Sequence, residues 1–182
     1  MDRDSLLADL KRHPSWDERE EGFRQQMADF LETEPDCFLR RHLERHFTAS
    51  ALVLDGEGEQ VLLMHHRKLD RWLQPGGHAD GESDLLAVAQ KEVFEETGLG
   101  GLKALSLRPF DLDIHLIPAR KSVPEHYHYD VRFLFTADRN QPLAINHESK
   151  DLRWVDLELA RELTGSESVS RMLDKAKAGW RP

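Results

Sequence analysis

Residues 84–97 constrain the fold more than any other segment, because their spacing fits one amphipathic helix. At 100° per residue, the apolar residues fall on one stripe that we expect to be buried, namely Leu86, Ala89 and Val93. Glu92, Glu95 and Glu96 form a second stripe beside it. Three carboxylates within about one helical turn repel one another. A hard divalent cation such as Mg²⁺ would remove that repulsion, because it takes oxygen ligands. A solvated acidic helix face is the alternative explanation.

The residues around this helix follow a longer pattern. Residues 76–99 read GGHADGESDLLAVAQKEVFEETGL, and this stretch resembles the Nudix box through Gly77, Glu92, Val93, Glu95, Glu96, Gly98 and Leu99. Two positions depart from the family pattern: Ser83 stands where relatives have Glu, and Lys91 stands where they have Arg. Lysine offers a flexible point charge in place of a planar fork. Ser83 is a good N-cap for a helix beginning at Asp84, and Glu82 could replace the missing Glu in part.

The resemblance implies both a fold and a reaction. The Nudix fold is an α/β/α sandwich with a mixed sheet, here over about residues 47–165. Its enzymes hydrolyse a nucleoside diphosphate linked to another moiety, such as a nucleotide sugar, and divalent metal ions neutralise charge on the pyrophosphate. By motif position, the ligands for Mg²⁺, with Mn²⁺ as an alternative, would be the backbone carbonyl of Gly76 and the carboxylates of Glu92, Glu95 and Glu96.

Hydrolysis also needs a carboxylate that removes a proton from the attacking water. Within the box, Glu92 and Glu96 are the catalytic candidates. Some relatives take this glutamate from a later loop, and Glu148 in the polar stretch NHESKD is our candidate for that role. The alternative for Glu148 is an ordinary exposed loop acid.

The overall composition fits one enzyme domain with a small appendage. The chain has 182 residues and a formal net charge of −9, which argues against a nucleic-acid-binding surface because such a surface needs a basic stripe. Its single cysteine, Cys37, allows no internal disulfide and suits a reducing compartment. No apolar run is long enough for a membrane span, and the acidic start MDRDSLLADL is unlike a signal peptide. We therefore expect a cytoplasmic protein that acts on a small-molecule, nucleotide-like substrate, with no nucleic-acid or membrane partner.

Periodicity divides the chain into two predicted parts. Residues 1–46 have helical spacing throughout and are predicted to form an amino-terminal helical extension packed on the core, with helix starts at Ser15 and Asp36. Residues 47–182 are predicted to be the Nudix domain. Its predicted elements are a hairpin of ASALVLD and QVLLMHH, the strands SLRPFDLDIHLI, HYHYDVRFLFTA and DLRWV, and the terminal helices DLELARELT and SVSRMLDKAKA. The predicted fold class is thus α/β, and a homodimer is left open.

Histidine and aspartate alternate along two of the predicted strands. Residues two apart share a face of a strand, and the two sets are Asp111, Asp113 and His115, and His126, His128 and Asp130. We predict that the strands pair with His115 opposite His126. The shared face is either part of a substrate cleft or a solvent-facing surface with His–Asp hydrogen bonds. Zinc binding by His126 and His128 is a further option, for which no third ligand is known.

Basic and aromatic residues near the box are candidates for substrate binding. Arg67 and Lys68 could hold a terminal phosphate, and Trp72 could stack on a base. The candidate set is completed by four histidines, which are His78, His115, His126 and His128. The substrate itself is left open.

Two other activities compete with a rapid hydrolase. A catalytically weak Nudix-fold domain that binds a metabolite or has a regulatory role would explain Ser83 and Lys91. An isomerase on the same scaffold would require a catalytic cysteine near the cleft, whereas Cys37 precedes the first predicted strand.

Overall fold

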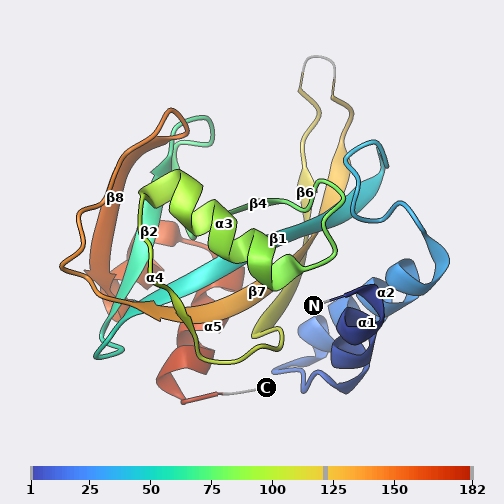
Figure 1. Cartoon of the computed structure of the whole chain (residues 1–182), viewed down its shortest axis with the longest axis horizontal. Helices are drawn as coiled ribbons and strands as arrows, with labels where there is room; N and C mark the ends of the chain where they lie inside the picture. Colours follow the sequence, from blue (N-terminus) through green and yellow to red (C-terminus); the bar gives the residue numbers. More distant parts are fainter. Residues whose placement is uncertain (1, 121–122, 181–182) are drawn as a thin grey trace.

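The computed structural model describes residues 2–120 and 123–180, which form a mixed β-sheet between helices (Figure 1). The helices are α1 (Arg3–Arg12), α2 (Glu18–Thr33), α3 (Leu85–Thr97), α4 (Leu157–Thr164) and α5 (Glu167–Lys177). The strands are β1 (Arg45–Asp55), β2 (Gln60–His66), β3 (Arg71–Leu73), β4 (Gly76–His78), β5 (Lys103–Ala104), β6 (Asp111–Ile117), β7 (His126–Ala137) and β8 (Ser149–Asp156). Within this part of the chain, no helix combines the length and the apolar character needed to cross a bilayer.

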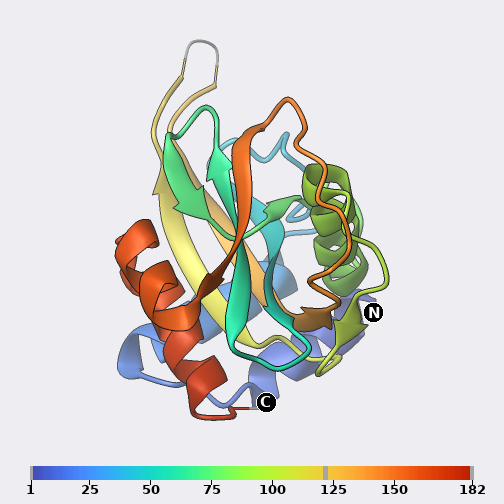
Figure 2. The ribbon, with the colours of Figure 1, turned by 90° about the vertical axis from the view of Figure 1, so that its left-hand side faces the viewer.

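Strand β1 is the central strand of the sheet. It pairs in parallel with β7 along its whole length and antiparallel with β2 and β4. Antiparallel pairing then adds β3 and β8 to β2, and β5 and β6 to β7. Figure 2 shows α3 on one side of the sheet and α4 and α5 on the other. The predicted α/β/α sandwich with a mixed sheet is therefore confirmed, and so is the β1–β2 hairpin.

The two central strands are polar over only part of one face. On the face toward α4 and α5, the first half of each strand is polar, through the pairs His46–His128, Thr48–Asp130 and Ser50–Arg132. Leu52 and Leu134 then begin an apolar part that packs with α4 and α5. The opposite face is apolar along its length and packs with α1, α2 and α3. Because strand residues alternate between faces, the polar half forms a continuous surface where a site can assemble.

The amino-terminal helices differ from the prediction in their boundaries. Helix α2 begins after Asp17, whose side chain accepts a hydrogen bond from the backbone N–H of Glu20 at 2.7 Å. The predicted start at Ser15 is therefore wrong by two residues. The predicted helix after Asp36 is also wrong, because residues 34–44 form turns. Cys37 and Phe38 of that segment are buried in the core, whereas Leu43 is 61% exposed, so its apolar residues do not form one buried face.

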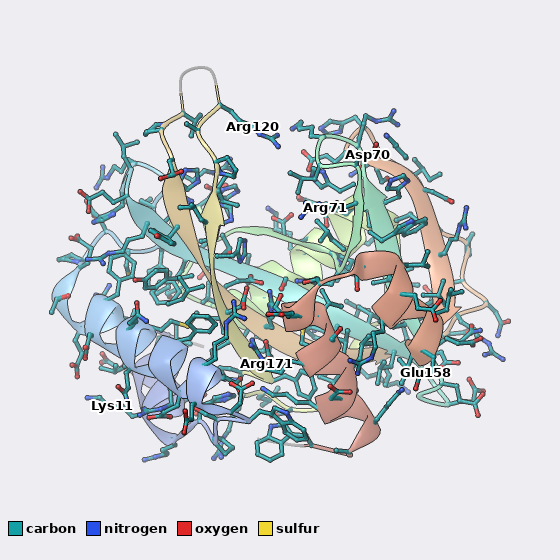
Figure 3. All side chains as sticks on the ribbon, turned by 180° about the vertical axis from the view of Figure 1, so that it is seen from behind. Lys11, Asp70, Arg71, Arg120, Glu158 and Arg171 are labelled. Atoms are coloured by element: carbon teal, nitrogen blue, oxygen red, sulfur yellow. The ribbon has the colours of Figure 1, made fainter. Side chains whose placement is uncertain are left out.

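A buried ionic cluster connects α2, β6, β7 and α5, and its members are Glu20, Asp111, Asp113, Asp130, Arg132, Arg171 and Lys175. The fully buried Nζ of Lys175 lies 2.5 Å from Glu20 Oε1 and 2.8 Å from Asp111 Oδ1. Arg171 donates two hydrogen bonds of 2.8 Å to Asp111. Figure 3 shows Arg171 on the side of α5 that faces the amino-terminal helices. The first helices are thus joined to the core by charge as well as packing, and a domain division at residue 46 stays a prediction.

Candidate functional site

Helix α3 is fixed at both ends. Its N-cap is Asp84, whose side chain accepts a hydrogen bond from the backbone N–H of Ala87 at 3.1 Å, so the prediction of Ser83 as the cap is wrong by one residue. Its C-cap is Gly98, with a φ of 72°, and a Cβ there would also lie 2.8 Å from the Cβ of Ala144. The helix packs on β1 through apolar residues that are buried, namely Leu85, Val88, Ala89 and Val93, and Leu86 is partly buried.

The three glutamates of α3 differ in exposure. Glu96 is 5% exposed, and its Oε2 accepts a hydrogen bond from the backbone N–H of Gly76 at 2.9 Å. Glu92 lies against Gly77, where an added Cβ would approach the Glu92 Cδ to 2.5 Å and would displace the Glu92 carboxylate. The side chain of Glu95 is 52% exposed. The predicted glutamate stripe of α3 therefore lies beside the β4 backbone and extends from the buried Glu96 to the exposed Glu95.

These glutamates carry more negative charge than neighbouring side chains compensate. Burial raises the pKa of Glu96 to about 8, and the charges of nearby glutamates add to this effect. Burial also raises the pKa of Glu92. Lys91 Nζ lies 3.9 Å from Glu92 Oε1 and 3.5 Å from Glu95 Oε2, and it is largely exposed. Uncompensated carboxylate oxygens beside a backbone carbonyl are a donor set that fits Mg²⁺ or Mn²⁺.

The structure brings Glu148 to this group from the loop before β8. The charge of Glu148 contributes to the raised pKa of Glu96, which places it nearby. The backbone N–H of Arg67 donates to the Glu148 carbonyl at 2.7 Å. The Asn146 side-chain amide donates to the carbonyl of Glu95 at 2.9 Å, which joins this loop to α3. Two separate contacts therefore hold the loop beside the glutamates.

The candidate substrate residues before the box make other contacts. The guanidinium of Arg67 donates to two carbonyls of the loop that carries Glu148, at 3.1 and 2.7 Å. Trp72 stacks on His65 with ring centroids 5.0 Å apart and packs against the core beside α4 and α5. Lys68 is exposed in the turn between β2 and β3. Of these three, Arg67 is therefore linked to the glutamates, through the loop that it holds.

Two further residues have clear local roles. Glu82 accepts a hydrogen bond from the backbone N–H of Asp84 at 2.9 Å, next to the start of α3. Cys37 is fully buried, and burial raises its pKa to about 11. Its thiol is therefore protonated at neutral pH and is not the exposed thiolate that an isomerase would require.

The two strands that carry histidine and aspartate pair with each other, but in a different register from the one predicted. Strands β6 and β7 place His115 opposite His128 and Ile117 opposite His126, so the predicted pairing of His115 with His126 is wrong by two residues. An isolated bridge between Arg120 and Val123 keeps the same register beyond the two strands. An even shift leaves each side chain on its predicted face, and the shared face is confirmed.

This shared face is largely buried and not a solvent-facing surface. Asp111, Asp113 and Asp130 all accept hydrogen bonds from Arg132, at 3.2, 3.0 and 2.8 Å. Burial by itself would raise the pKa of Asp113, but Arg132, His115 and Arg171 together hold that pKa below its usual range. The side chain of His115 is 40% exposed. The aspartates of this face therefore belong to the buried ionic cluster.

Histidines gather where the polar half of β1 and β7 meets β4. His46, His78 and His128 each have a possible ligand atom within 4.8 Å of those of the other two. Burial lowers the pKa of His46, that of His78 to about 4 and that of His128 to about 2, so all three are neutral at neutral pH. His46 was not a sequence candidate. Its signal was its alternation with Thr48 and Ser50 on one face of a strand.

Comparisons with known proteins agree on one fold. The family model of the NUDIX domain matches residues 44–175. A C. elegans Ap4A hydrolase has a similar structure, with a TM-score of 0.55, 18% identity, and 73% of this chain and 96% of that chain covered. The E. coli dihydroneopterin triphosphate pyrophosphohydrolase is similar with a TM-score of 0.55 and 17% identity, and 71% of this chain and 92% of that chain are covered. The M. smegmatis Nudix hydrolase RenU is similar with a TM-score of 0.55 and 19% identity, and 75% of this chain and 86% of that chain are covered. A search of curated proteins found no significant match.

Proposed function

This chain belongs to the Nudix hydrolase family, which generally cleaves pyrophosphate bonds, and we propose that it is a Mg²⁺-dependent hydrolase of a nucleoside diphosphate linked to another moiety, such as a nucleotide sugar. The observation that carries the proposal is the state of Glu96. It is buried beside Gly76, its pKa is raised to about 8, and no arginine or lysine contacts it among the described residues. A buried carboxylate of this kind is stabilised in its ionised form by a bound cation.

Four groups would hold the ion: the backbone carbonyl of Gly76 and the carboxylates of Glu92, Glu95 and Glu96. Nudix hydrolases generally use divalent metal ions, and Mn²⁺ is the alternative to Mg²⁺ here. When bound, such an ion neutralises negative charge on the pyrophosphate oxygens. The protein fixes the position of Glu96 through the Gly76 N–H, and the absence of a side chain at Gly77 lets Glu92 lie against β4. Glu95 faces solvent, where a substrate arrives.

Glu148 is the proposed general base, with Glu92 and Glu96 as the alternatives. It approaches the glutamates from a separate loop. It can therefore act on water while the glutamates of α3 hold the metal. The contacts of Arg67 and Asn146 fix that loop at 2.7 to 3.1 Å. Removal of a proton by a fixed carboxylate contributes roughly 10²–10⁴-fold to a rate.

The polar half of β1 and β7 is the proposed floor of the substrate site. This surface runs from His78 of β4 toward His128, His126 and His115. Because burial keeps His78 and His128 neutral, these rings suit hydrogen bonding to a sugar or base better than charge pairing with phosphate. Lys68 and Trp72 precede the box in the sequence. They remain candidates for binding the moiety that is linked to the nucleoside diphosphate.

A screen for cleavage of the pyrophosphate bond tests the proposal. The panel contains nucleotide sugars, dinucleotides and nucleoside triphosphates, each with Mg²⁺, with Mn²⁺ and with a chelator. The products are separated by chromatography, because this reaction yields phosphate monoesters or pyrophosphate and no free phosphate. We expect cleavage that requires the metal and that is nearly abolished in Glu95→Gln and Glu96→Gln. The matched control is Glu162→Gln, which changes an exposed glutamate of α4 and should keep full activity.

Two results would contradict this assignment. Glu96→Gln with wild-type turnover would exclude the glutamates as the metal site. Tight binding of a panel compound without turnover would support the alternative function, a weakly catalytic binding or regulatory domain. Ser83 and Lys91, which depart from the family pattern, favour that alternative.

A further inference from the structure

We propose that His46, His78 and His128 form a second metal site, separate from the glutamates, that binds a transition-metal ion of the Zn²⁺ type. A possible ligand atom of each side chain lies within 4.8 Å of those of the other two. Imidazole nitrogens are common ligands for Zn²⁺ and for the neighbouring transition metals, whereas Mg²⁺ takes oxygen ligands. The same chain would therefore hold two metals with different donor chemistry.

His46 is the residue that points to a missing ligand. Its Nδ1 lies 3.2 Å from the carbonyl of His42, and since a carbonyl only accepts hydrogen bonds, Nδ1 carries the proton. The other ring nitrogen, Nε2, then has a lone pair. This Nε2 atom is buried and has no hydrogen-bond partner among the described residues. His46 as a whole is 3% exposed. Histidines that bind metals commonly donate their second nitrogen to a carbonyl in this way.

Three strands hold the three rings together. His46 is paired with His128 across β1 and β7, and His78 of β4 is paired with Thr48, the next residue on the same face of β1. The ring centroids lie 5.2 Å apart for His46 and His78, 5.1 Å for His46 and His128, and 4.8 Å for His78 and His128. Nitrogen ligands of a tetrahedral zinc lie about 3.4 Å apart, so shifts of about 1 Å would close the rings on an ion.

A water molecule is a weaker explanation for this arrangement. His126 Nδ1 lies 2.9 Å from the carbonyl of Pro124 and therefore carries a proton, so His126 Nε2 accepts a hydrogen bond of 3.2 Å from His128 Nε2. The free lone pair of His128 is then on Nδ1. The three neutral imidazoles of the site still present three lone pairs, and one water donates only two hydrogen bonds. Three protonated rings at these separations would repel one another, and Arg40 adds a further positive charge nearby. A metal ion satisfies all three lone pairs at once.

Strand β4 separates this histidine site from the glutamates. Gly77 faces α3, because an added Cβ there would meet Glu92. Gly76 and His78 face the other side, where an added Cβ at Gly76 would meet Ser50 at 2.3 Å. Alternation along a strand therefore directs oxygen donors and nitrogen donors to opposite sides.

The test is metal binding by the full chain, measured apart from any hydrolysis. Protein freed of metal is titrated with Zn²⁺, and separately with Co²⁺ for its visible spectrum, in a buffer with excess Mg²⁺ to occupy oxygen sites. We expect one equivalent of Zn²⁺ to bind. His128→Asn and His78→Asn should each weaken binding by more than about a hundredfold.

Two matched variants define the site. His115→Asn changes a histidine of the same sheet face, with its ring 5.5 Å from that of His128, and should keep the wild-type affinity for Zn²⁺. Glu96→Gln should also keep it, because the glutamates belong to the other site. This result is independent of the proposed hydrolase activity, since neither outcome requires a substrate.

Several results would overturn the proposal: no Zn²⁺ binding by the wild type, equal binding by the His78 and His128 variants, or a loss confined to Glu96→Gln. Thermal unfolding in chelator checks that the variants fold. If His128→Asn does not fold, His78→Asn and the ¹⁵N shifts of the wild-type rings decide the question. Zn²⁺ should move the His46 Nε2 signal, and an unchanged signal in the presence of Zn²⁺ would exclude His46 as a ligand.

Discussion

Glu96 of the box and Asp111 of the ionic cluster are both buried, yet their surroundings compensate their charges to opposite degrees. Asp111 receives two hydrogen bonds from Arg171 and lies 2.8 Å from Lys175. Burial alone would raise its pKa, but these cations hold that pKa below its usual range. Glu96 receives one backbone N–H, and burial raises its pKa to about 8. A carboxylate that the chain neutralises is structural, and one that it leaves uncompensated is available to a cation from outside.

The largest expected effect is on the neutralised side of this comparison. Asp111→Asn should lower the free energy of unfolding by about 3–5 kcal/mol, because it leaves Arg171 and Lys175 buried with too little negative charge. Urea unfolding at neutral pH measures this. Asp174→Asn, which breaks the exposed pair with Arg161, is the control and should cost about 1 kcal/mol or less. Equal costs for the two variants would remove the distinction between the two sets of carboxylates.

On the uncompensated side, activity should fall while the fold is kept. Glu96→Gln should reduce turnover by about 10²–10³-fold, corresponding to about 3–4 kcal/mol of activation free energy. Its unfolding free energy without metal should equal or exceed that of the wild type at pH 8, since the amide needs no ionisation. Steady-state kinetics with Mg²⁺ and urea unfolding without it provide the two readings. A variant that unfolds as easily as Asp111→Asn would place Glu96 with the structural carboxylates.

Stability should also depend on pH with opposite signs. Glu96 keeps its proton in the folded state up to about pH 8 but loses it near 4.5 when unfolded. The folded chain then binds more protons, so stability without metal falls as pH rises through this range. The histidines with lowered pKa act oppositely below pH 6.5, where the unfolded chain binds more protons. Asp113, with its lowered pKa, contributes stability above pH 3.8 that is lost as pH falls.

Comparison with Glu96→Gln isolates the contribution of Glu96 between pH 6.5 and 8, because unfolded histidines still lose protons at the lower end of this window. Relative to Glu96→Gln, the unfolding free energy of the wild type in chelator should decline by about 1–2 kcal/mol across it. Mg²⁺ should remove this difference between the two proteins. Equal slopes for the wild type and Glu96→Gln would mean that the pH dependence has another source.

The smallest effect concerns Lys91, which among the described residues is the one cation that reaches both Glu92 and Glu95. Lys91→Arg should change turnover by no more than about threefold, because an exposed ion pair contributes about 1 kcal/mol or less. The planar fork should hold the glutamates more firmly, so we expect the change to be an increase at low Mg²⁺. Kinetics across a Mg²⁺ titration measure it. A large gain would mean that Lys91 limits the activity of this chain.

Much of the fold could be predicted because it depends on local sequence patterns. Alternation and turn residues indicated β1, β2, β6, β7 and β8, and helical spacing indicated α3, α4 and α5. Two errors came from competition between local signals and packing. The segment after Asp36 has helical spacing but forms turns against the core, and Ser83 is a good cap that Asp84 displaces. The β6–β7 register was missed because alternation fixes the face of each strand residue and does not distinguish registers that differ by two residues.

The sequence by itself determined the family, the glutamate helix and the face on which each strand residue lies, because these depend on spacing along one segment. Only the tertiary structure decided which charges meet. Arg171 and Lys175 reach Asp111 from about sixty residues away, whereas no cation in the part of the chain that the structure describes pairs with Glu96. It also decided that His46 joins His78 and His128, because three strands distant in sequence bring them together. Burial and charge compensation depend on those long-range contacts, and they separate structural carboxylates from functional ones.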